Sequence, residues 1–230
     1  MAQKYAFLID AERCIFCRAC VVACKLENHV GSQWQRNDVI LIGPDQTKNP
    51  AMYPVFMNCQ HCERPACIAA CPVENKAIEK RDDGVVLIIP DKCVGDEMCV
   101  YACPYGALRL APRKNKYGYN VVDKCTYCVH KLDRDADAPG SNQPACVMTC
   151  PNRALEFGLR DELMAKVRRE GREILNIDKY GMGPGNIILK PRQVRVTSAL
   201  TGSEMMSVAG WTFDLKDLRV GNSTDVMPVG

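Results

Sequence analysis

Short apolar segments recur along the chain and are separated by stretches rich in glycine, proline and charged residues. Five of them have the length and the branched or aromatic content that is typical of β-strands. Two other stretches, residues 18–26 and 65–70, have the composition of short helices. The pattern predicts small units of strands and helices that repeat along the chain. The expected strands are residues 5–9, 53–57, 85–89, 107–110 and 120–122.

The C-terminal part follows a different pattern. Residues 161–174 place Leu163, Val167 and Ile174 on one side of a helix, which predicts an amphipathic helix. From residue 181 onward the chain shows no strong periodicity and contains no cysteine. The glycines that open this segment are not flanked by the strand–turn–helix unit of a phosphate-binding loop. We expect a helix that packs on a module or a partner, followed by an irregular tail that wraps a larger subunit.

Composition and charge narrow the class of protein. The chain has 230 residues, of which 47% are hydrophobic, and a formal net charge of +3. No basic run resembles a nucleic-acid-binding patch, and no apolar run, residues 85–89 included, approaches the length of a membrane span. Residues 1–4 show no start of a signal peptide. We therefore expect no nucleic-acid partner and no direct membrane span. The expected location is the cytoplasm, or the periplasm by co-export with a partner.

Fifteen cysteines fall into four compact groups. In bacterial ferredoxins the run C-x2-C-x2-C-x3-C-P holds one [4Fe–4S] cluster with its first three thiolates, while the fourth thiolate ligates a partner cluster. The first two groups follow this spacing closely, and in the third Asp96 stands where a cysteine is expected. The groups are Cys14, Cys17, Cys20 and Cys24; Cys59, Cys62, Cys67 and Cys71; Cys93, Asp96, Cys99 and Cys103; and Cys125, Cys128, Cys146 and Cys150. They predict a carrier of four iron–sulfur clusters.

Two other uses of cysteine fit this pattern less well. A disulfide scaffold suits a small secreted chain, and an odd number of cysteines would leave one thiol unpaired. Structural zinc uses C-x2-C pairs, but usually two pairs separated by a spacer and not three thiolates within one short turn. Iron–sulfur ligation is therefore favoured, and a zinc-stabilised interaction module is kept as an alternative.

Exchange of the fourth ligand predicts how the groups pair. The second and third groups are adjacent in the sequence and are expected to form one two-cluster module, so the first and fourth groups pair across it. We number the four sites by their expected ligands. These are Cys14, Cys17, Cys20 and Cys150 for site 1; Cys24, Cys125, Cys128 and Cys146 for site 2; Cys59, Cys62, Cys67 and Cys103 for site 3; and Cys71, Cys93, Asp96 and Cys99 for site 4.

The expected fold class is α+β, with one ferredoxin-like two-cluster module inserted in another. A strand, a cysteine loop and a short helix make half of such a module. We expect an outer module of residues 1–45 and 112–160, an inserted module of residues 46–111, and a C-terminal helix and tail in residues 161–230. Because these modules are small and rich in loops, metal ligation is expected to supply much of the folding free energy.

Asp96 leaves the cofactor of site 4 open. In the first interpretation the Asp96 carboxylate ligates a fourth iron, which gives a [4Fe-4S] cluster with one labile corner. In the second that iron is absent, which leaves a [3Fe-4S] centre. A third interpretation is that Asp96 faces solvent in an ordinary turn. We favour ligation in the reduced protein, with loss of iron on oxidation. The expected cofactors are thus four iron–sulfur clusters, three of them [4Fe-4S] and one either [4Fe-4S] or [3Fe-4S].

Three short stretches extend the cysteine pattern: Ala-Cys-Lys at residues 23–25, Lys-Cys-Thr-Tyr-Cys at 124–128 and Cys-Pro-Tyr-Gly-Ala at 103–107. With the four groups they resemble the four-cluster electron-transfer subunits of molybdenum or tungsten bis-pterin oxidoreductases, the dimethyl-sulfoxide-reductase superfamily. The resemblance implies a row of clusters that connects a large pterin-containing catalytic subunit to a membrane quinone-linked subunit or a soluble redox carrier. Asp96 departs from the family's usual cysteine. Related nitrate-reductase subunits have tryptophan there and hold a three-iron cluster.

The leading hypothesis is therefore an electron-transfer subunit that is not catalytic alone. No nucleophile–base pair and no Walker loop accompanies the cysteines. The alternative within the same chemistry is a polyferredoxin partner of a hydrogenase or an aldehyde oxidoreductase.

Some neighbours of the cysteines have two interpretations. Lys25, Lys92 and Lys124 each lie beside a ligand cysteine, where a cation would stabilise a reduced cluster. An exposed lysine that balances surface charge is the simpler interpretation for each of them. His61 could donate to a cluster sulfur, but a solvated loop histidine is the simpler interpretation.

Overall fold

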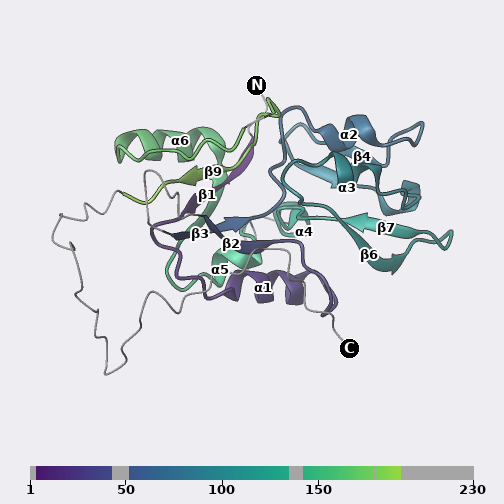
Figure 1. The fold of residues 1–230 in the computed structure, drawn as a ribbon, viewed down its shortest axis with the longest axis horizontal. Coiled ribbons are helices and arrows are strands. Elements are labelled where there is room, and N and C mark those ends of the chain that lie inside the picture. The colour runs from purple at the N-terminus through teal and green to yellow at the C-terminus, as the bar shows by residue number, and fades with distance from the viewer. Residues whose placement is uncertain (1–3, 43–51, 135–141, 179, 193–230) are drawn as a thin grey trace, which may run out of the picture. The chain divides into compact units, whose positions relative to one another are not determined.

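Short strands and helices alternate along the chain in a computed structural model that describes residues 4–42, 52–134, 142–178 and 180–192 (Figure 1). All of these lie within the unit Met1–Arg192. Among the described residues no helix has the length and apolar character to cross a bilayer. The elements are β1 (Tyr5–Asp10), α1 (Ala19–Glu27), β2 (Asp38–Ile42), β3 (Tyr53–Met57), α2 (Ala66–Ala70), β4 (Ile78–Lys80), β5 (Val86–Ile88), the 3-10 helix η1 (Pro90–Lys92), α3 (Met98–Ala102), β6 (Arg109–Lys114), β7 (Asn120–Asp123), α4 (Val129–Leu132), α5 (Ala145–Met148), β8 (Leu155–Leu159), α6 (Arg160–Arg169) and β9 (Ile187–Leu189).

A three-stranded sheet joins segments that lie far apart in the sequence. β1 pairs antiparallel with β8 and parallel with β9, in the order β8-β1-β9. Because side chains alternate along a strand, β1 contributes to two cores. Phe7 and Ile9 enter a core that contains several cysteines, whereas Ala6 and Leu8 pack with residues of α6 and β9. The first strand, β1, therefore packs against α6 and β9, the last described elements of the chain.

Three antiparallel hairpins carry the other strands: β2–β3, β4–β5 and β6–β7. The β6–β7 turn is held by Asn115, whose Oδ1 accepts hydrogen bonds from the backbone N–H groups of Tyr117 and Tyr119, both at 3.0 Å. β3 ends just before Cys59, and β7 ends just before Cys125. The second strands of the β2–β3 and β6–β7 hairpins thus lead directly into cysteine loops.

Five cysteines lie within the short helices: Cys20 and Cys24 in α1, Cys67 in α2, Cys99 in α3 and Cys146 in α5. α2 is followed by Cys71 and Pro72, and α3 by Cys103 and Pro104. Since proline cannot continue a helix, both helices stop at a cysteine. α1 contacts α5, and α2 contacts α3. This gives two pairs of short helices, as two ferredoxin-like units require.

The C-terminal helix is shorter than predicted. α6 ends well before residue 174, because the chain turns at Gly171, whose φ of 60° favours glycine. Leu163 and Val167 are buried, as expected. Ile174 lies outside the helix and instead forms an isolated bridge with Leu189.

Part of the segment predicted to be an irregular tail is a strand. The three β9 residues Ile187, Ile188 and Leu189 are almost completely buried against β1. An apolar run of three residues is too short to predict a strand from periodicity, and only its pairing with β1 stabilises it. The remainder of the expected partner-wrapping tail, residues 193–230, lies outside the described residues.

Other strand boundaries also differ from the pattern-based prediction. The strand expected at residues 107–110 begins two residues later, since β6 spans Arg109–Lys114. β2, β4 and β8 were not expected. β4 has three residues, of which only Ile78 is buried, so that it carries almost no hydrophobic alternation.

Candidate iron–sulfur centres

Three of the four expected ligand sets surround cavities. The four site 1 cysteines line one cavity, the four site 3 cysteines line a second, and Asp96 lines a third with the site 4 cysteines. In each of them two donors come from a loop, the third from the helix that follows it and the fourth from a cysteine farther along or back in the chain; the helical donors are Cys20 in α1, Cys67 in α2 and Cys99 in α3. Each iron of a cubane takes its own protein ligand, so cluster donors surround a space and do not converge on one point. Among the described residues no three His, Cys, Asp or Glu side chains converge closely enough to hold a single metal ion.

The site 2 cysteines also lie together. The Asn28 side-chain Nδ2 lies 3.6 Å from the Sγ of Cys24 and 3.9 Å from the Sγ of Cys128. Burial raises the pKa of Cys24, and the neighbouring thiols of Cys125 and Cys128 raise it further. Burial likewise raises the pKa of Cys146, with contributions from Cys125 and Cys24. The structure therefore brings all four expected groups of donors together.

The four sites follow one another in a row. At each step from one site to the next, two thiols belong to the same buried cluster of side chains, and one of them raises the pKa of the other, although burial contributes more to that pKa. These pairs are Cys20 and Cys146 between sites 1 and 2, Cys59 and Cys125 between sites 2 and 3, and Cys67 and Cys99 between sites 3 and 4. The order along the row is thus 1, 2, 3, 4.

The protonation of the thiols indicates what the sites can bind. Burial raises the pKa of Cys20 and Cys62 to about 12 and that of Cys67 to about 11, and neighbouring thiols add to the effect. Thiols of such high pKa keep their protons at neutral pH unless a metal cation replaces them. Soft sulfur donors around a largely apolar space are the ligands that iron–sulfur clusters use, so the residues fit this cofactor. When bound, such a cluster supplies a one-electron carrier.

Backbone N–H groups point at cysteine sulfurs in all four sites. Such hydrogen bonds fix the side chain and disperse negative charge on the sulfur, which influences reduction potential. The donors and acceptors are Ala154 to Cys150 at 3.2 Å, Tyr127 to Cys125 at 3.5 Å, Ala107 to Cys103 at 3.5 Å, Ala77 to Cys71 at 3.4 Å and Val122 to Cys93 at 3.4 Å.

Site 2 also receives hydrogen bonds from a side-chain amide that an ion pair orients. Arg36 and Asp123 form a salt bridge at 2.8 Å, with each side chain 9% exposed. Arg36 Nη1 also donates to Asn28 Oδ1 at 2.7 Å. Because the oxygen of the amide faces Arg36, its NH2 group must face the sulfurs of Cys24 and Cys128.

A second side-chain amide, that of Asn58 after β3, also contacts site 2. Asn58 Nδ2 donates to the Sγ of Cys125 at 3.5 Å, while its Oδ1 accepts from Asn186 Nδ2 at 2.8 Å. Asn186 is fixed in turn because its Oδ1 accepts from the Phe7 backbone N–H at 3.1 Å and from the Tyr127 hydroxyl. Cysteine spacing does not predict these asparagines. Asn28 could have been found, since it follows Cys24 by one helical turn.

Asp96 lies in a turn at the edge of the site 4 cavity. It is exposed, and its Oδ1 accepts a hydrogen bond from the Met98 backbone N–H at 2.8 Å at the start of α3. The same side chain lines the site 4 cavity and contributes to the raised pKa of Cys99, after burial and Cys67. One carboxylate oxygen is thus committed to the turn.

Lys124 and His61 are buried, so the simpler interpretation of each as a solvated residue is wrong. Lys124 is 1% exposed, and its Nζ donates to the carbonyl oxygens of Val86 and Cys125. His61 is 4% exposed, and its Nδ1 accepts from the Val86 backbone N–H at 2.8 Å. Its ring lies against that of Tyr127, with 3.7 Å between the centroids.

The other two lysines lie nearer to solvent. Lys92 is exposed, as expected, and its Nζ donates to the Asn75 carbonyl at 3.2 Å. Lys25 is partly buried, and its Nζ donates to the carbonyl oxygens of Ser32 at 2.9 Å and Trp34 at 2.8 Å. Both lysines therefore brace nearby loops through backbone carbonyls.

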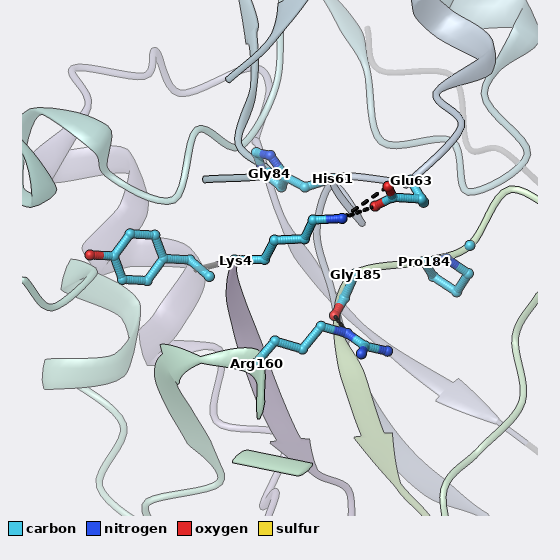
Figure 2. A pocket seen from close by; sticks show the side chains of 9 residues that line it. Lys4, His61, Glu63, Gly84, Arg160, Pro184 and Gly185 are labelled. Atoms are coloured by element: carbon cyan, nitrogen blue, oxygen red, sulfur yellow. Dashed lines mark hydrogen bonds and ion pairs between the residues drawn. The ribbon is translucent and has the colours of Figure 1, made fainter. Parts of the chain in front are cut away.

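The largest cavity of the five described lies beside the site 3 loop and contains no cysteine. It measures about 220 Å³, and Figure 2 shows Lys4 reaching across it to Glu63, at 2.8 Å. The glycine-rich segment at residues 183–185 closes another side, because Gly185 N–H donates to Gln60 O at 2.8 Å and Glu63 N–H donates to Gly183 O at 2.7 Å. This segment therefore supports the cysteine loop of site 3.

Comparison with known proteins extends these observations. Two family models, both described as 4Fe-4S dicluster domains, match residues 13–75 and 50–160. The chain is 36% identical over 164 residues to the thiosulfate reductase electron transfer subunit of Salmonella typhi, which covers 70% of this chain and 79% of that protein. It is 33% identical over 216 residues to one of the chains of the anaerobic dimethyl sulfoxide reductase of Escherichia coli (strain K12), which covers 88% and 96%.

A third relative is one of the subunits of the sulfite dehydrogenase of Allochromatium vinosum, which is 31% identical over 214 residues and covers 84% of this chain and 85% of that protein. The two dicluster matches together span all four cysteine groups. The chain therefore belongs to the family of iron–sulfur electron-transfer subunits of the molybdenum- and tungsten-pterin oxidoreductases, the dimethyl-sulfoxide-reductase superfamily.

Proposed function

We propose that this chain carries electrons through four iron–sulfur clusters between a molybdenum or tungsten pterin catalytic subunit and an external electron donor or acceptor. The observation that carries the proposal is the row of four donor sets, in which each set is next to the following one through a pair of thiols that share a buried cluster of side chains. A row of carriers divides a long transfer into short steps. The chain's own residues fix the carriers, limit their contact with water and set their potentials.

The four ligand sets are assigned as the ligand-exchange rule predicts. The cavities of sites 1, 3 and 4 and the bridging of Cys24 and Cys128 by Asn28 support this assignment. The contacts of β1 with β8 and of α1 with α5 support an outer module of residues 1–45 and 112–160. The contacts of α2 with α3 support an inserted module of residues 46–111.

Site 4 takes a [4Fe-4S] cluster with Asp96 as the fourth ligand in the reduced protein, and a [3Fe-4S] centre forms when that iron is lost on oxidation. Two observations support this proposal. Asp96 lines the cavity with the three thiols, and only its Oδ1 is engaged by the Met98 N–H. The carboxylate is also exposed, which suits a ligand that exchanges easily.

Electrons enter and leave at the two ends of the row. Cys17 of site 1 and Asp96 of site 4 are exposed, whereas all four site 2 cysteines are buried. A partner can therefore approach either terminal cluster closely. The catalytic subunit would contact one end, and a membrane quinone-linked subunit or a soluble redox carrier would contact the other.

The proposed partnership is tested by isolating the tagged full-length chain anaerobically from its host. We expect a large subunit that contains molybdenum or tungsten with pterin to be isolated with it in a fixed ratio. A nickel-containing partner would favour the polyferredoxin alternative and contradict the proposal. Fractionation of the cells before isolation decides between the cytoplasm and the periplasm, the two proposed locations.

A further inference from the structure

Lys124 is a buried cation that has no acidic partner in the described part of the chain. Its Nζ donates to the carbonyl oxygens of Val86 and Cys125, and it forms no ion pair with any described carboxylate. The nearest acidic residue in sequence, Asp123, is committed to Arg36 at 2.8 Å. Burying an ammonium group away from both water and a negative charge costs several kcal/mol (on the order of 5). Some negative charge near Lys124 must therefore offset that cost.

Within the described residues, the groups around Lys124 that can supply this charge belong to the sites. Lys124 Nζ donates to the backbone carbonyl of Cys125, which belongs to site 2. It also donates to the carbonyl of Val86, and Val86 lines the site 3 cavity together with Cys67. The ammonium therefore lies between the two sites.

We propose that the Lys124 ammonium is a shared counter-ion for the clusters of sites 2 and 3 and raises the reduction potentials of both. The inference rests on the proposed ligand sets. It adds a specific residue that sets the energy of the middle step of the row.

The direction of the effect follows from the charges. One-electron reduction takes a tetrathiolate [4Fe–4S] site from a net charge of about −2 to about −3. The electron comes from the neighbouring site in the row, and no proton or ligand is exchanged. A fixed positive charge stabilises the more negative state, and burial prevents salt and water from screening it.

Lys92 provides a matched comparison within the chain. It stands immediately before Cys93 of site 4, as Lys124 stands immediately before Cys125 of site 2. Lys92 is exposed, however, while Lys124 is 1% exposed. The same residue type at the same sequence offset should therefore have a large effect at one site and a small effect at the other.

The test is an EPR-monitored redox titration, with dithionite as reductant, of the cluster-loaded full-length chain. Lys124→Met should lower the midpoint potentials of two of the four clusters, each by about a tenfold change in the reduction equilibrium, or ~59 mV for one electron. Lys92→Met should leave all four midpoints nearly unchanged, and Lys124→Arg should preserve the wild-type values. Four unchanged midpoints in Lys124→Met with full iron content would overturn the proposal, while the proposed function would stand.

Loss of clusters in the variant is also informative. If Lys124→Met and Lys124→Gln load fewer clusters but Lys124→Arg loads all four, the charge is required and the proposal is supported. If Lys124→Arg fails equally, the lysine serves packing and the proposal is wrong. If the wild-type chain itself lacks four EPR-active or iron-containing centres, the proposed function fails instead.

Discussion

Side-chain amides distinguish site 2 from its neighbours at the scale of single residues. Asn28 and Asn58 donate to three of its thiol sulfurs, and both amides are oriented by groups that occupy their oxygens. In the described residues the sulfurs of the other sites receive hydrogen bonds from backbone N–H groups alone. Hydrogen bonds to cluster sulfurs raise reduction potential. The cluster of site 2 should therefore have a higher reduction potential than the clusters of sites 1 and 3.

This difference predicts the effect of replacing Asn58 with leucine, which has nearly the same shape but no donor. Asn58→Leu should lower the midpoint potential of a single cluster by about a tenfold change in the reduction equilibrium (~59 mV). Asn152→Leu is the control, because Asn152 Nδ2 lies beside site 1 but donates to the Arg13 carbonyl at 2.7 Å. A potentiometric titration followed by EPR measures both. Equal shifts in the two variants would contradict the assignment.

Asp96 gives a second prediction at this scale. Asp96→Cys should hold a [4Fe-4S] cluster in site 4 that survives oxidation, because thiolate binds iron more firmly than a carboxylate that is exposed to solvent. Asp96→Ala should yield a three-iron centre even in the reduced protein. Low-temperature EPR of reduced and oxidised samples measures both. A stable oxidised three-iron signal in the wild type under strict anaerobiosis would remove ligation by Asp96.

The residue scale also shows what the sequence could and could not predict. Cysteine spacing is local, so the donor loops of all four sites follow directly from it. The burial of Lys124 and His61 depends on Val86 and Tyr127, which come from other segments of the chain. Lys92 and Lys124 have the same local sequence context and opposite exposure, so no local pattern could separate them.

At the scale of elements, the end of β1 is tied to the segment that precedes β9. Arg172 donates through both terminal nitrogens to the two carboxylate oxygens of Asp10, each at 2.9 Å, and its side chain is 4% exposed. Arg172 also donates to the Lys190 carbonyl at 3.1 Å. This ion pair therefore helps to hold the C-terminal segment on the sheet.

The Asp10 pair predicts a pH-dependent contribution to stability. Burial raises the Asp10 pKa, but the hydrogen bonds and charge of Arg172 outweigh burial and bring it below 3.8. A carboxyl whose pKa is lower when folded stabilises the fold above the unfolded value and loses this as the pH falls through the folded value. Asp10→Asn should cost about 3 kcal/mol at pH 7. Thermal melts should show the difference from wild type narrowing below about pH 4; a constant difference would contradict this.

The contact of the glycine-rich segment with the site 3 loop predicts a further effect. Gly183 has a φ of 63°, and a Cβ there would lie 2.9 Å from the Glu63 Cβ. Gly118 has a φ of 86° but no atom within 4 Å of an added Cβ. Gly183→Ala should therefore destabilise the loaded protein by about 1–3 kcal/mol more than Gly118→Ala, which suffers backbone strain alone. Denaturant midpoints compare the two, and equal losses would mean that this contact does not support the loop.

Strands were predicted correctly where the apolar segment is long, and were missed where only pairing with another strand stabilises them. β1 and β3 were predicted because each carries several consecutive strand-type residues. β9 and β4 have three residues each and exist only through their partners, which local patterning cannot reveal. α6 was predicted too long because its apolar spacing continues past Gly171, where the backbone leaves the helix.

At the scale of the whole molecule, the four sites form a continuous part of the core. Cysteines of sites 1 and 2 and Cys59 of site 3 belong to one buried cluster of side chains, and Cys67 of site 3 belongs to a second cluster with the cysteines of site 4, so that site 3 joins the two. The cysteines line cavities within these cores, so the bound clusters should complete the packing and link the segments that supply the ligands. Chelation of iron should therefore unfold the chain as a whole, with loss of far-UV circular dichroism alongside loss of visible colour. Retention of native circular dichroism by the iron-free chain would contradict this expectation.

Iron content tests most directly whether this one chain binds four clusters. The full-length protein, prepared or reconstituted under strict anaerobiosis, should be brown. It should carry about 15 or 16 iron atoms per molecule, with the lower value corresponding to a three-iron centre at site 4. A pale protein with far fewer than about 12 irons after reconstitution would contradict the binding of four clusters, because three complete [4Fe-4S] clusters already require that number.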